Sequence, residues 1–177
     1  MAVKKNILIT RRLPPDVEAR AARDYDVVQS GGDQIMEREE ILAKSTGMDA
    51  ILCCLSEKFD ADLISRLPDC VKILATFSVG TDHIDLDAAR KHGLRVGNTP
   101  DAVTISTAEI AMLLILGAAH RTREGVNMLH SRSWPGWEAM QLLGVRLSGK
   151  RLGILGLGQI GQAVAKRARA FDMEIHY

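Results

Sequence analysis

A glycine motif near residue 160 limits the folds open to this chain more than any other part of its sequence. Residues 152–155 form a short apolar run, residues 156–161 are Gly-Leu-Gly-Gln-Ile-Gly, and residues 162–168 are good helix formers. A strand, a tight turn and a helix in this order suit the pyrophosphate of a dinucleotide. Gly156 would permit the turn, Gly158 would let the backbone approach the phosphates, and Gly161 would let helix and strand pack closely. A glycine-rich turn that binds no ligand is the alternative interpretation.

Strand-like and helix-like segments alternate through the first hundred residues. The apolar, strand-like runs are residues 6–10, 25–28, 50–55, 71–76 and 94–98. The helix-like segments between them are residues 14–24, 36–43, 60–67 and 86–92. Because such alternation forms right-handed βαβ crossovers, we predict a parallel sheet that is covered on both faces.

A longer helix is predicted to begin near Thr99 and to mark the boundary between two lobes. Thr99, Pro100 and Asp101 suit a helix start. Residues 108–118 are apolar almost all round, which is typical of a buried helix, here one between the lobes. The following residues, up to about 150, are more polar and contain both tryptophans, Trp134 and Trp137.

Composition excludes several classes of function. The chain has 177 residues with a net charge of +1, so no electrostatic feature favours a nucleic-acid or acidic-membrane partner. The most apolar run, residues 110–119, is too short to span a bilayer. Cys53, Cys54 and Cys70 lack C-x-x-C spacing, which favours reduced thiols in a cytoplasmic protein. No cluster of His, Cys and Asp has metal-ligand spacing, so we predict no metal site.

Three segments follow strands of the first lobe, where open α/β sheets bind their ligands: residues 55–58, 77–85 and 98–100. In the second of these segments Gly80 permits close backbone approach, and neighbouring N–H groups there are suited to a carboxylate. His83 lies beside Asp82 and Asp85, but neither carboxylate has a spacing that argues for a proton relay. We therefore interpret His83 as part of the loop's structure.

Several of these strings resemble the D-isomer-specific 2-hydroxyacid dehydrogenases. Residues 78–86, Ser-Val-Gly-Thr-Asp-His-Ile-Asp-Leu, resemble the carboxylate-binding loop of that family. Residues 98–101, 107–111, Arg121 and 152–165 also match it, and residues 132–138 look most like the glycerate dehydrogenase and glyoxylate/hydroxypyruvate reductase branch. The resemblance covers the whole chain. It implies an α/β protein, with a flavodoxin-like, parallel-sheet substrate lobe in residues 1–98. Residues 99–177 would hold a linking helix, a dimerisation segment and the first part of a Rossmann NAD(P)-binding lobe.

The resemblance also implies roles for particular residues. Backbone N–H groups of Val79 and Gly80 would bind a substrate carboxylate, and Leu55 and Ser56 would line that pocket. The implied cofactor-binding residues are Thr107, Gly156, Gly158, Gln159, Ile160 and Gly161. One of the two tryptophans would reach across a homodimer interface in residues 99–150 toward the partner's pocket. Simple packing of the tryptophans within that interface is an equally weighted alternative.

The implied reaction is hydride transfer between NAD or NADP and a small 2-keto or 2-hydroxy acid, with glyoxylate or hydroxypyruvate reduced to glycolate or D-glycerate. The family's catalytic arginine and histidine–glutamate pair would fall beyond Tyr177. We therefore assign no catalytic residue and expect the 177-residue chain to be inactive alone. The alternatives are a non-catalytic, corepressor-like dinucleotide-binding protein and a fragment that only dimerises.

Overall fold

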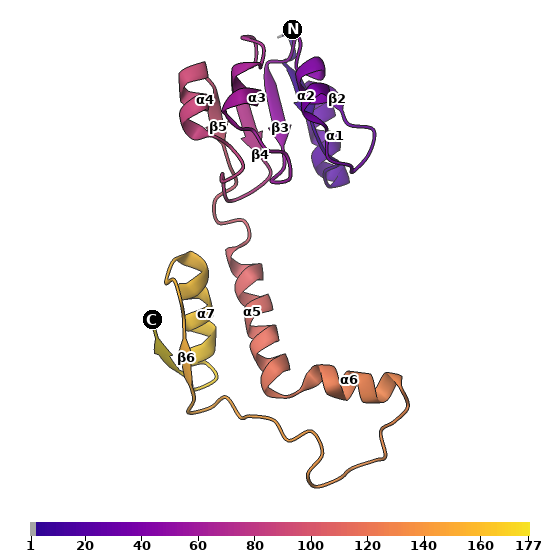
Figure 1. Ribbon diagram of the computed structural model, residues 1–177, viewed down its shortest axis with the longest axis vertical. Helices are drawn as coiled ribbons and strands as arrows, with labels where there is room; N and C mark the ends of the chain where they lie inside the picture. The colour runs from indigo at the N-terminus through magenta and orange to yellow at the C-terminus, as the bar shows by residue number, and fades with distance from the viewer. Residues whose placement is uncertain (1–2) are drawn as a thin grey trace. The chain divides into compact units, whose positions relative to one another are not determined.

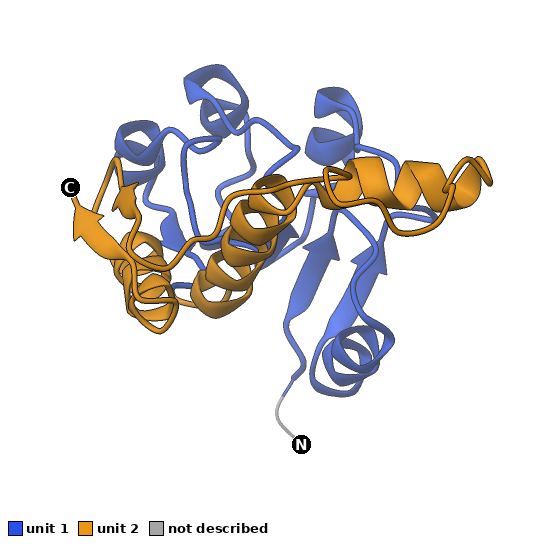
Figure 2. Cartoon of the chain, turned by 90° about the horizontal axis from the view of Figure 1, so that it is seen from below, with its two compact units in different colours: residues 1–100 blue, residues 101–177 orange. Residues whose placement is uncertain are grey.

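The computed structural model describes residues 3–177, which form two compact units. Residues 1–100 make up unit 1 and residues 101–177 make up unit 2, as the two colours of Figure 2 show. The boundary predicted from the sequence lies after residue 98. Each unit has its own hydrophobic core, so each is described by itself.

A parallel sheet of five strands forms the centre of unit 1 (Figure 1). Its strands are β1 (Asn6–Ile9), β2 (Asp26–Gln29), β3 (Ala50–Cys53), β4 (Ile73–Thr76) and β5 (Arg95–Gly97). They pair in the order β2-β1-β3-β4-β5, and every pair is parallel. This order is that of the flavodoxin-like doubly wound fold, which confirms the predicted fold class of the first lobe.

The helices of unit 1 are distributed unequally over the two faces of the sheet. They are α1 (Pro15–Asp24), α2 (Arg38–Lys44), α3 (Ala61–Ser65) and α4 (Leu86–His92). The core that contains Leu8, Ile51 and Leu74 draws on α2, α3 and α4, whereas Ile9 and Leu52 pack on the other face with α1. Right-handed crossovers explain this division, because only the β1-to-β2 connection runs toward the β2 edge of the sheet.

The prediction that both faces are covered is therefore only partly right. α1 leaves a hollow of about 400 Å³ on its face, and Ile73 is 44% exposed there. One helix cannot cover a sheet of five strands, so apolar side chains of the central strands remain accessible in this chain. The hollow is lined by Lys5, Ile7, Tyr25, Asp49, Ala50, Ile51, Leu52, Lys72, Ile73 and Ala75.

Local sequence signals account for the ends of α4. The Asp85 carboxylate accepts a hydrogen bond of 2.9 Å from the Ala88 N–H and so caps the first turn. Gly93 ends the helix in the left-handed conformation, with φ of 81°, which glycine adopts without steric cost. The loop after β4 therefore enters α4 with a defined geometry.

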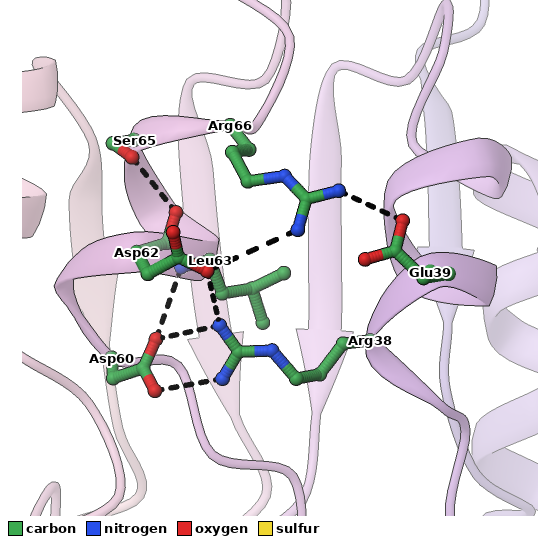
Figure 3. A network of polar contacts seen from close by, with 7 residues as sticks. All are labelled: Arg38, Glu39, Asp60, Asp62, Leu63, Ser65 and Arg66. Atoms are coloured by element: carbon green, nitrogen blue, oxygen red, sulfur yellow. Dashed lines mark hydrogen bonds and ion pairs between the residues drawn. The ribbon is translucent and has the colours of Figure 1, made fainter.

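A network of ion pairs joins α2 and α3 on the outer side of unit 1 (Figure 3). Arg38 donates to both carboxylate oxygens of Asp60, at 2.7 and 3.0 Å, and to Asp62 at 2.7 Å. Arg66 pairs with Glu39 at 2.8 Å. Asp60 also caps α3 by accepting from the Leu63 N–H at 3.0 Å. The Arg38 guanidinium and this backbone donor hold the pKa of Asp60 well below its usual value.

Unit 2 begins with two helices and continues into a βαβ segment. Its elements are α5 (Thr104–Ala119), α6 (Thr122–His130), β6 (Arg151–Gly153), α7 (Gln159–Arg169) and β7 (Glu174–His176). β6 and β7 pair in parallel. Ala108 and Met112 of α5 pack against Val164 and Ala168 of α7, so these two helices form the core of the unit.

The long helix differs from its prediction in two respects. α5 begins at Thr104 rather than near Thr99, because residues 100–103 form turns and Asp101 takes a positive φ of 64°. It is also not buried all round, since Ile110, Leu113 and Leu114 are exposed. A helix that is apolar on every side needs partners on every side, and α6 and α7 cover only part of it. No helix within residues 3–177 combines the length and the hydropathy needed to cross a membrane.

Candidate functional site

Two of the predicted loops lie side by side at the carboxyl edge of the unit 1 sheet. β3 and β4 are adjacent, with Cys53 opposite Thr76, and both strands end there. The Phe77 N–H continues the ladder by donating to the Cys53 carbonyl at 2.8 Å. Leu55 and Ser56 follow β3, and Val79 and Gly80 follow β4. The four predicted substrate residues therefore share one edge of the sheet.

A short parallel bridge joins the segments that carry these loops. The Phe59 N–H donates to the His83 carbonyl at 2.8 Å, and the Asp85 N–H donates to the Phe59 carbonyl at 2.9 Å. The Phe59 side chain is fully buried in the core of unit 1. The two loops are therefore anchored to each other as well as to the sheet.

A chain of hydrogen bonds runs through the loop after β4 and determines the role of His83. Ser78 Oγ donates to the Gly80 carbonyl at 2.8 Å, so it must accept from Thr76 Oγ1, which lies 2.7 Å away. Thr76 has then used its proton, and it accepts from His83 Nε2 at 2.9 Å. Burial lowers the pKa of His83, which keeps the ring neutral near pH 7. This hydrogen-bond chain uses the Nε2–H of His83 inside the loop.

Residues 98 and 99 orient the two N–H groups that the sequence predicts to bind a carboxylate. The Thr99 N–H donates to the Ser78 carbonyl at 2.9 Å, and Asn98 Nδ2 donates to the Val79 carbonyl at 2.7 Å. In a trans peptide the C=O and N–H point in opposite directions. Fixing these carbonyls therefore directs the N–H groups of Val79 and Gly80 away from residues 98 and 99. Neither N–H has an acceptor among the hydrogen bonds of the described residues.

The turn after β3 is held by Arg11 and Glu57, for which the sequence predicts no role. Leu55 projects outward and is 69% exposed. Ser56 Oγ accepts from Arg11 Nη1 at 2.9 Å, and the Glu57 carboxylate closes the turn by accepting from the Cys54 N–H at 2.8 Å. Arg11 is 45 positions from Ser56. Arg11 and Ser56 both lie in segments whose residues are typical of loops, so the sequence carries no signal that these two side chains are in contact.

The glycine turn of unit 2 has the geometry that its residue types imply. Gly156 has φ of 94°, a conformation that L-residues rarely adopt. A Cβ on Gly161 would collide with the carbonyl oxygen of Gly156, whereas a Cβ on Gly158 would meet open space. Gly158 is the N-cap of α7 and provides no side-chain cap, so the first N–H groups of α7, at Gln159 and Ile160, face no capping side chain. Such a helix N-terminus is suited to phosphate oxygens.

Thr107 and the tryptophans also belong to unit 2. Thr107 is exposed on α5, and in Figure 1 the start of α5 and the turn after β6 lie at the same end of the unit. Trp134 donates from Nε1 to Gln141 Oε1 at 3.0 Å, while Trp137 is 84% exposed. The structure thus groups the predicted substrate residues in unit 1 and the predicted cofactor residues in unit 2. Within residues 3–177, no group of three or more His, Cys, Asp or Glu side chains is arranged to hold a metal ion.

Comparison with known proteins gives a consistent result over nearly the whole chain. The family model described as D-isomer specific 2-hydroxyacid dehydrogenase, catalytic domain, matches residues 7–171. A glycerate dehydrogenase of Hyphomicrobium methylovorum is 51% identical over 174 residues. That alignment covers 98% of this chain and 54% of the relative.

Solved structures show the same relationship. A Polaromonas protein described as a D-isomer specific, NAD-binding 2-hydroxyacid dehydrogenase superposes with a TM-score of 0.91 at 41% identity, over 99% of this chain and 55% of that one. An NADPH-dependent glyoxylate/hydroxypyruvate reductase of Sinorhizobium meliloti, in complex with NADP and malonate, gives a TM-score of 0.82 at 27% identity, over 99% and 53%. The chain spans about half the length of the relatives it matches. With the family model matching residues 7–171, the chain belongs to the D-isomer specific 2-hydroxyacid dehydrogenase family.

Proposed function

We propose that this chain provides the substrate lobe and the first part of the nucleotide lobe of an NAD- or NADP-dependent reductase of glyoxylate or hydroxypyruvate. The products would be glycolate or D-glycerate. The observation that carries the proposal is the pair of outward N–H groups at Val79 and Gly80, whose peptide planes are held by Thr99 and Asn98. The names of the similar proteins, glycerate dehydrogenase and glyoxylate/hydroxypyruvate reductase, support this choice of substrates.

The substrate carboxylate would accept hydrogen bonds from both N–H groups. Two backbone donors in successive peptides form a small concave site for an anion. Their positions are set before the ligand arrives, so little ordering free energy is lost on binding. Leu55 and Ser56, on the neighbouring loop, would line the pocket beside the 2-keto acid.

The glycine turn fits a dinucleotide pyrophosphate. The open space at Gly158 and the uncapped N-terminus of α7 match what phosphate oxygens need. Gln159 and Ile160 would donate from the backbone, Gly156 and Gly161 would maintain the turn, and Thr107 would contact the nicotinamide half. When bound, the dinucleotide supplies or accepts the hydride. In this fold the residue that distinguishes NAD from NADP lies about 20 residues after the glycine motif.

We propose that residues after Tyr177 in the complete protein supply the catalytic cation and the acid/base pair. His83 is unsuited to acid/base catalysis, because its Nε2–H is used in the hydrogen bond to Thr76 inside the loop. The 177-residue chain alone would then show no reductase activity. Its free cysteines, Cys53, Cys54 and Cys70, suit a protein of the reducing cytoplasm.

Residues 99–150 are proposed to form a homodimer interface. Several large apolar side chains of this region are exposed: Ile110, Leu113, Leu114, Leu129, Trp134, Trp137, Met140 and Leu143. So many exposed large apolar side chains in one region of the chain favour a protein–protein contact. One tryptophan would either reach the partner's pocket or pack within the interface.

The decisive experiment compares the complete protein with the 177-residue chain. We expect the complete protein to oxidise NADH or NADPH when glyoxylate or hydroxypyruvate is added, and the 177-residue chain to show no such activity. Binding of NADH without turnover by the complete protein would instead favour the corepressor-like alternative. Turnover by the 177-residue chain would contradict the assignment of catalysis to later residues. Sedimentation of the complete protein as a monomer would contradict the dimer.

A further inference from the structure

A buried carboxylate lies directly behind the proposed substrate turn. The Glu57 side chain is fully inaccessible, and it lies between the ends of β1 and β3. Glu57 Oε2 accepts from the Cys54 N–H at 2.8 Å and from Thr10 Oγ1 at 3.1 Å. Glu57 Oε1 accepts from Ser56 Oγ at 3.3 Å. A carboxylate without solvent access is costly unless a cation and hydrogen-bond donors compensate it.

Arg11 supplies that cation and connects three loops. Its side chain is 17% exposed, and Nη1 lies 3.6 Å from Glu57 Oε1. The same Nη1 donates to Ser56 Oγ at 2.9 Å, while Nε and Nη2 donate to Asp33 at 3.2 and 3.1 Å. Arg11, Asp33 and Ser56 follow β1, β2 and β3 respectively. One guanidinium therefore holds together the loops at the carboxyl ends of three neighbouring strands.

The Ser56 hydroxyl is hydrogen-bonded to both members of this pair. It accepts from Arg11 and donates to Glu57, so its rotation is fixed and its proton is not available to a ligand. The turn can therefore offer a substrate its backbone and the outward side chain of Leu55, but not the Ser56 proton. The orientation of both depends on how Ser56 is held.

We propose that Arg11 and Glu57 are positioning residues for substrate binding, which act through Ser56 to hold the turn of residues 54–57 in its binding conformation. They do not touch the substrate in this proposal, which rests on the function proposed above. Because the turn contacts the substrate before and during the reaction, loss of the pair should weaken ground-state and transition-state binding together. The expected signature is a raised KM for the 2-keto acid with an unchanged kcat.

The test uses three variants of the complete protein, Arg11→Lys, Glu57→Gln and Ser56→Ala, with Arg12→Ala as the control. Arg12 is the exposed neighbour of Arg11, so its removal changes the net charge of the same segment without touching the network. Loss of one charged hydrogen bond corresponds to about a tenfold rise in KM. We expect a rise of that size in each of the three variants, with kcat and the KM for the nucleotide within about twofold of wild type. Arg12→Ala should match wild type.

A role limited to folding would lower the melting temperature of these variants and leave the KM of the folded protein unchanged, and that result would overturn the proposal. If Glu57→Gln does not fold, Ser56→Ala and the double variant Arg11→Lys/Ser56→Ala decide the question. Arg11 acting through Ser56 predicts that the double variant shows no larger rise in KM than the single ones. If the rises in KM of the two single variants multiply in the double variant, Arg11 does not act through Ser56.

Calorimetric titration with glyoxylate separates this inference from the proposed function. Wild type that binds glyoxylate but does not reduce it would contradict the proposed reaction, and the dissociation constants of the variants would still test the positioning role. Equal dissociation constants for wild type and Glu57→Gln would overturn the positioning role alone. A wild-type protein that neither binds nor reduces the 2-keto acid would overturn both.

Discussion

Asn98 Nδ2 donates a hydrogen bond of 2.7 Å to the carbonyl oxygen of Val79, across 19 positions of the chain. The contact orients the peptide between Val79 and Gly80 and thus the Gly80 N–H that the proposed carboxylate site uses. Replacing Asn98 by alanine removes the donor without adding bulk. We expect the KM for the 2-keto acid to rise about fivefold to tenfold, measured by steady-state kinetics on the complete protein. An unchanged KM would show that the loop keeps its geometry without Asn98.

Gly80→Ala tests whether the space beside the two N–H groups is needed by a ligand. A Cβ at residue 80 would lie 3.1 Å from an oxygen of the Asp82 carboxylate, which is an exposed side chain able to move. We therefore expect a small change in melting temperature and a clear rise in KM. Gly31→Ala is the control, because a Cβ there meets nothing within 4 Å. Equal kinetics in the two variants would argue against a substrate at Gly80.

His83 should make the stability of unit 1 sensitive to pH on the acid side of neutrality. Burial lowers the pKa of His83 below its ordinary 6.5, so the unfolded chain binds a proton before the folded one. The contribution of neutral His83 to the stability of unit 1 is complete above pH 6.5 and is lost as the pH falls through the folded-state pKa of His83. His83→Gln keeps an N–H for Thr76 but cannot titrate. The melting temperature should be measured from about pH 7.5 to about pH 5.5, which spans the ordinary histidine pKa. Over this range it should fall further for wild type than for this variant. Parallel pH curves would refute the explanation.

The glycine turn allows a direct separation of folding from nucleotide binding. In Gly161→Ala the new methyl group would collide with the Gly156 carbonyl, so we expect a loss of about 1–3 kcal/mol in unfolding free energy. In Gly158→Ala the methyl group enters open space, so stability should hold while the dissociation constant for NADH or NADPH rises. Thermal unfolding and nucleotide titration of both variants measure the two effects. Tight nucleotide binding by Gly158→Ala would contradict the proposed position of the pyrophosphate.

The ion pairs between α2 and α3 should matter at neutral pH and lose their effect in acid. Asp60→Asn keeps a good N-cap for α3 but removes the charge that pairs with Arg38. Because the pKa of Asp60 is held below its ordinary 3.8, its stabilising contribution is complete above that value and declines as the pH falls further. We expect a lower melting temperature than wild type at pH 7, and a difference that shrinks below pH 4. A difference independent of pH would exclude the charge as its cause.

Much of unit 1 could be predicted because its local signals are strong. Continuous apolar runs separated by helical segments predict buried parallel strands, and all five strands are present near the expected positions. Asp85 and Gly93 mark the ends of α4 in the sequence as well as in the structure. The family could also be predicted from the sequence, because residues 78–86 and 152–161 resemble its motifs. The match of the family model over residues 7–171 confirms this prediction.

Other features follow from the three-dimensional arrangement alone. The uneven cover of the sheet follows from the handedness of each crossover and from the strand order, which alternation does not specify. The exposure of α5 depends on which neighbours reach it, whereas its composition indicated only that it is apolar.

The chemistry of the candidate site divides in the same way. Residue types together with the family resemblance predict a carboxylate loop at Val79 and Gly80 and a phosphate turn at residues 156–161, and both sites stay predictions. They could be named from the sequence because glycine's freedom near φ of about 90° and the N–H groups of a helix start are local properties. The residues that hold the proposed substrate loops in position, Asn98, Arg11 and Glu57, are 19 to 47 positions from their partners Val79, Ser56 and Thr10. Contacts over such separations exist because parallel strands bring their carboxyl ends to one edge, so they emerge when the sheet is assembled and leave no pattern along the chain.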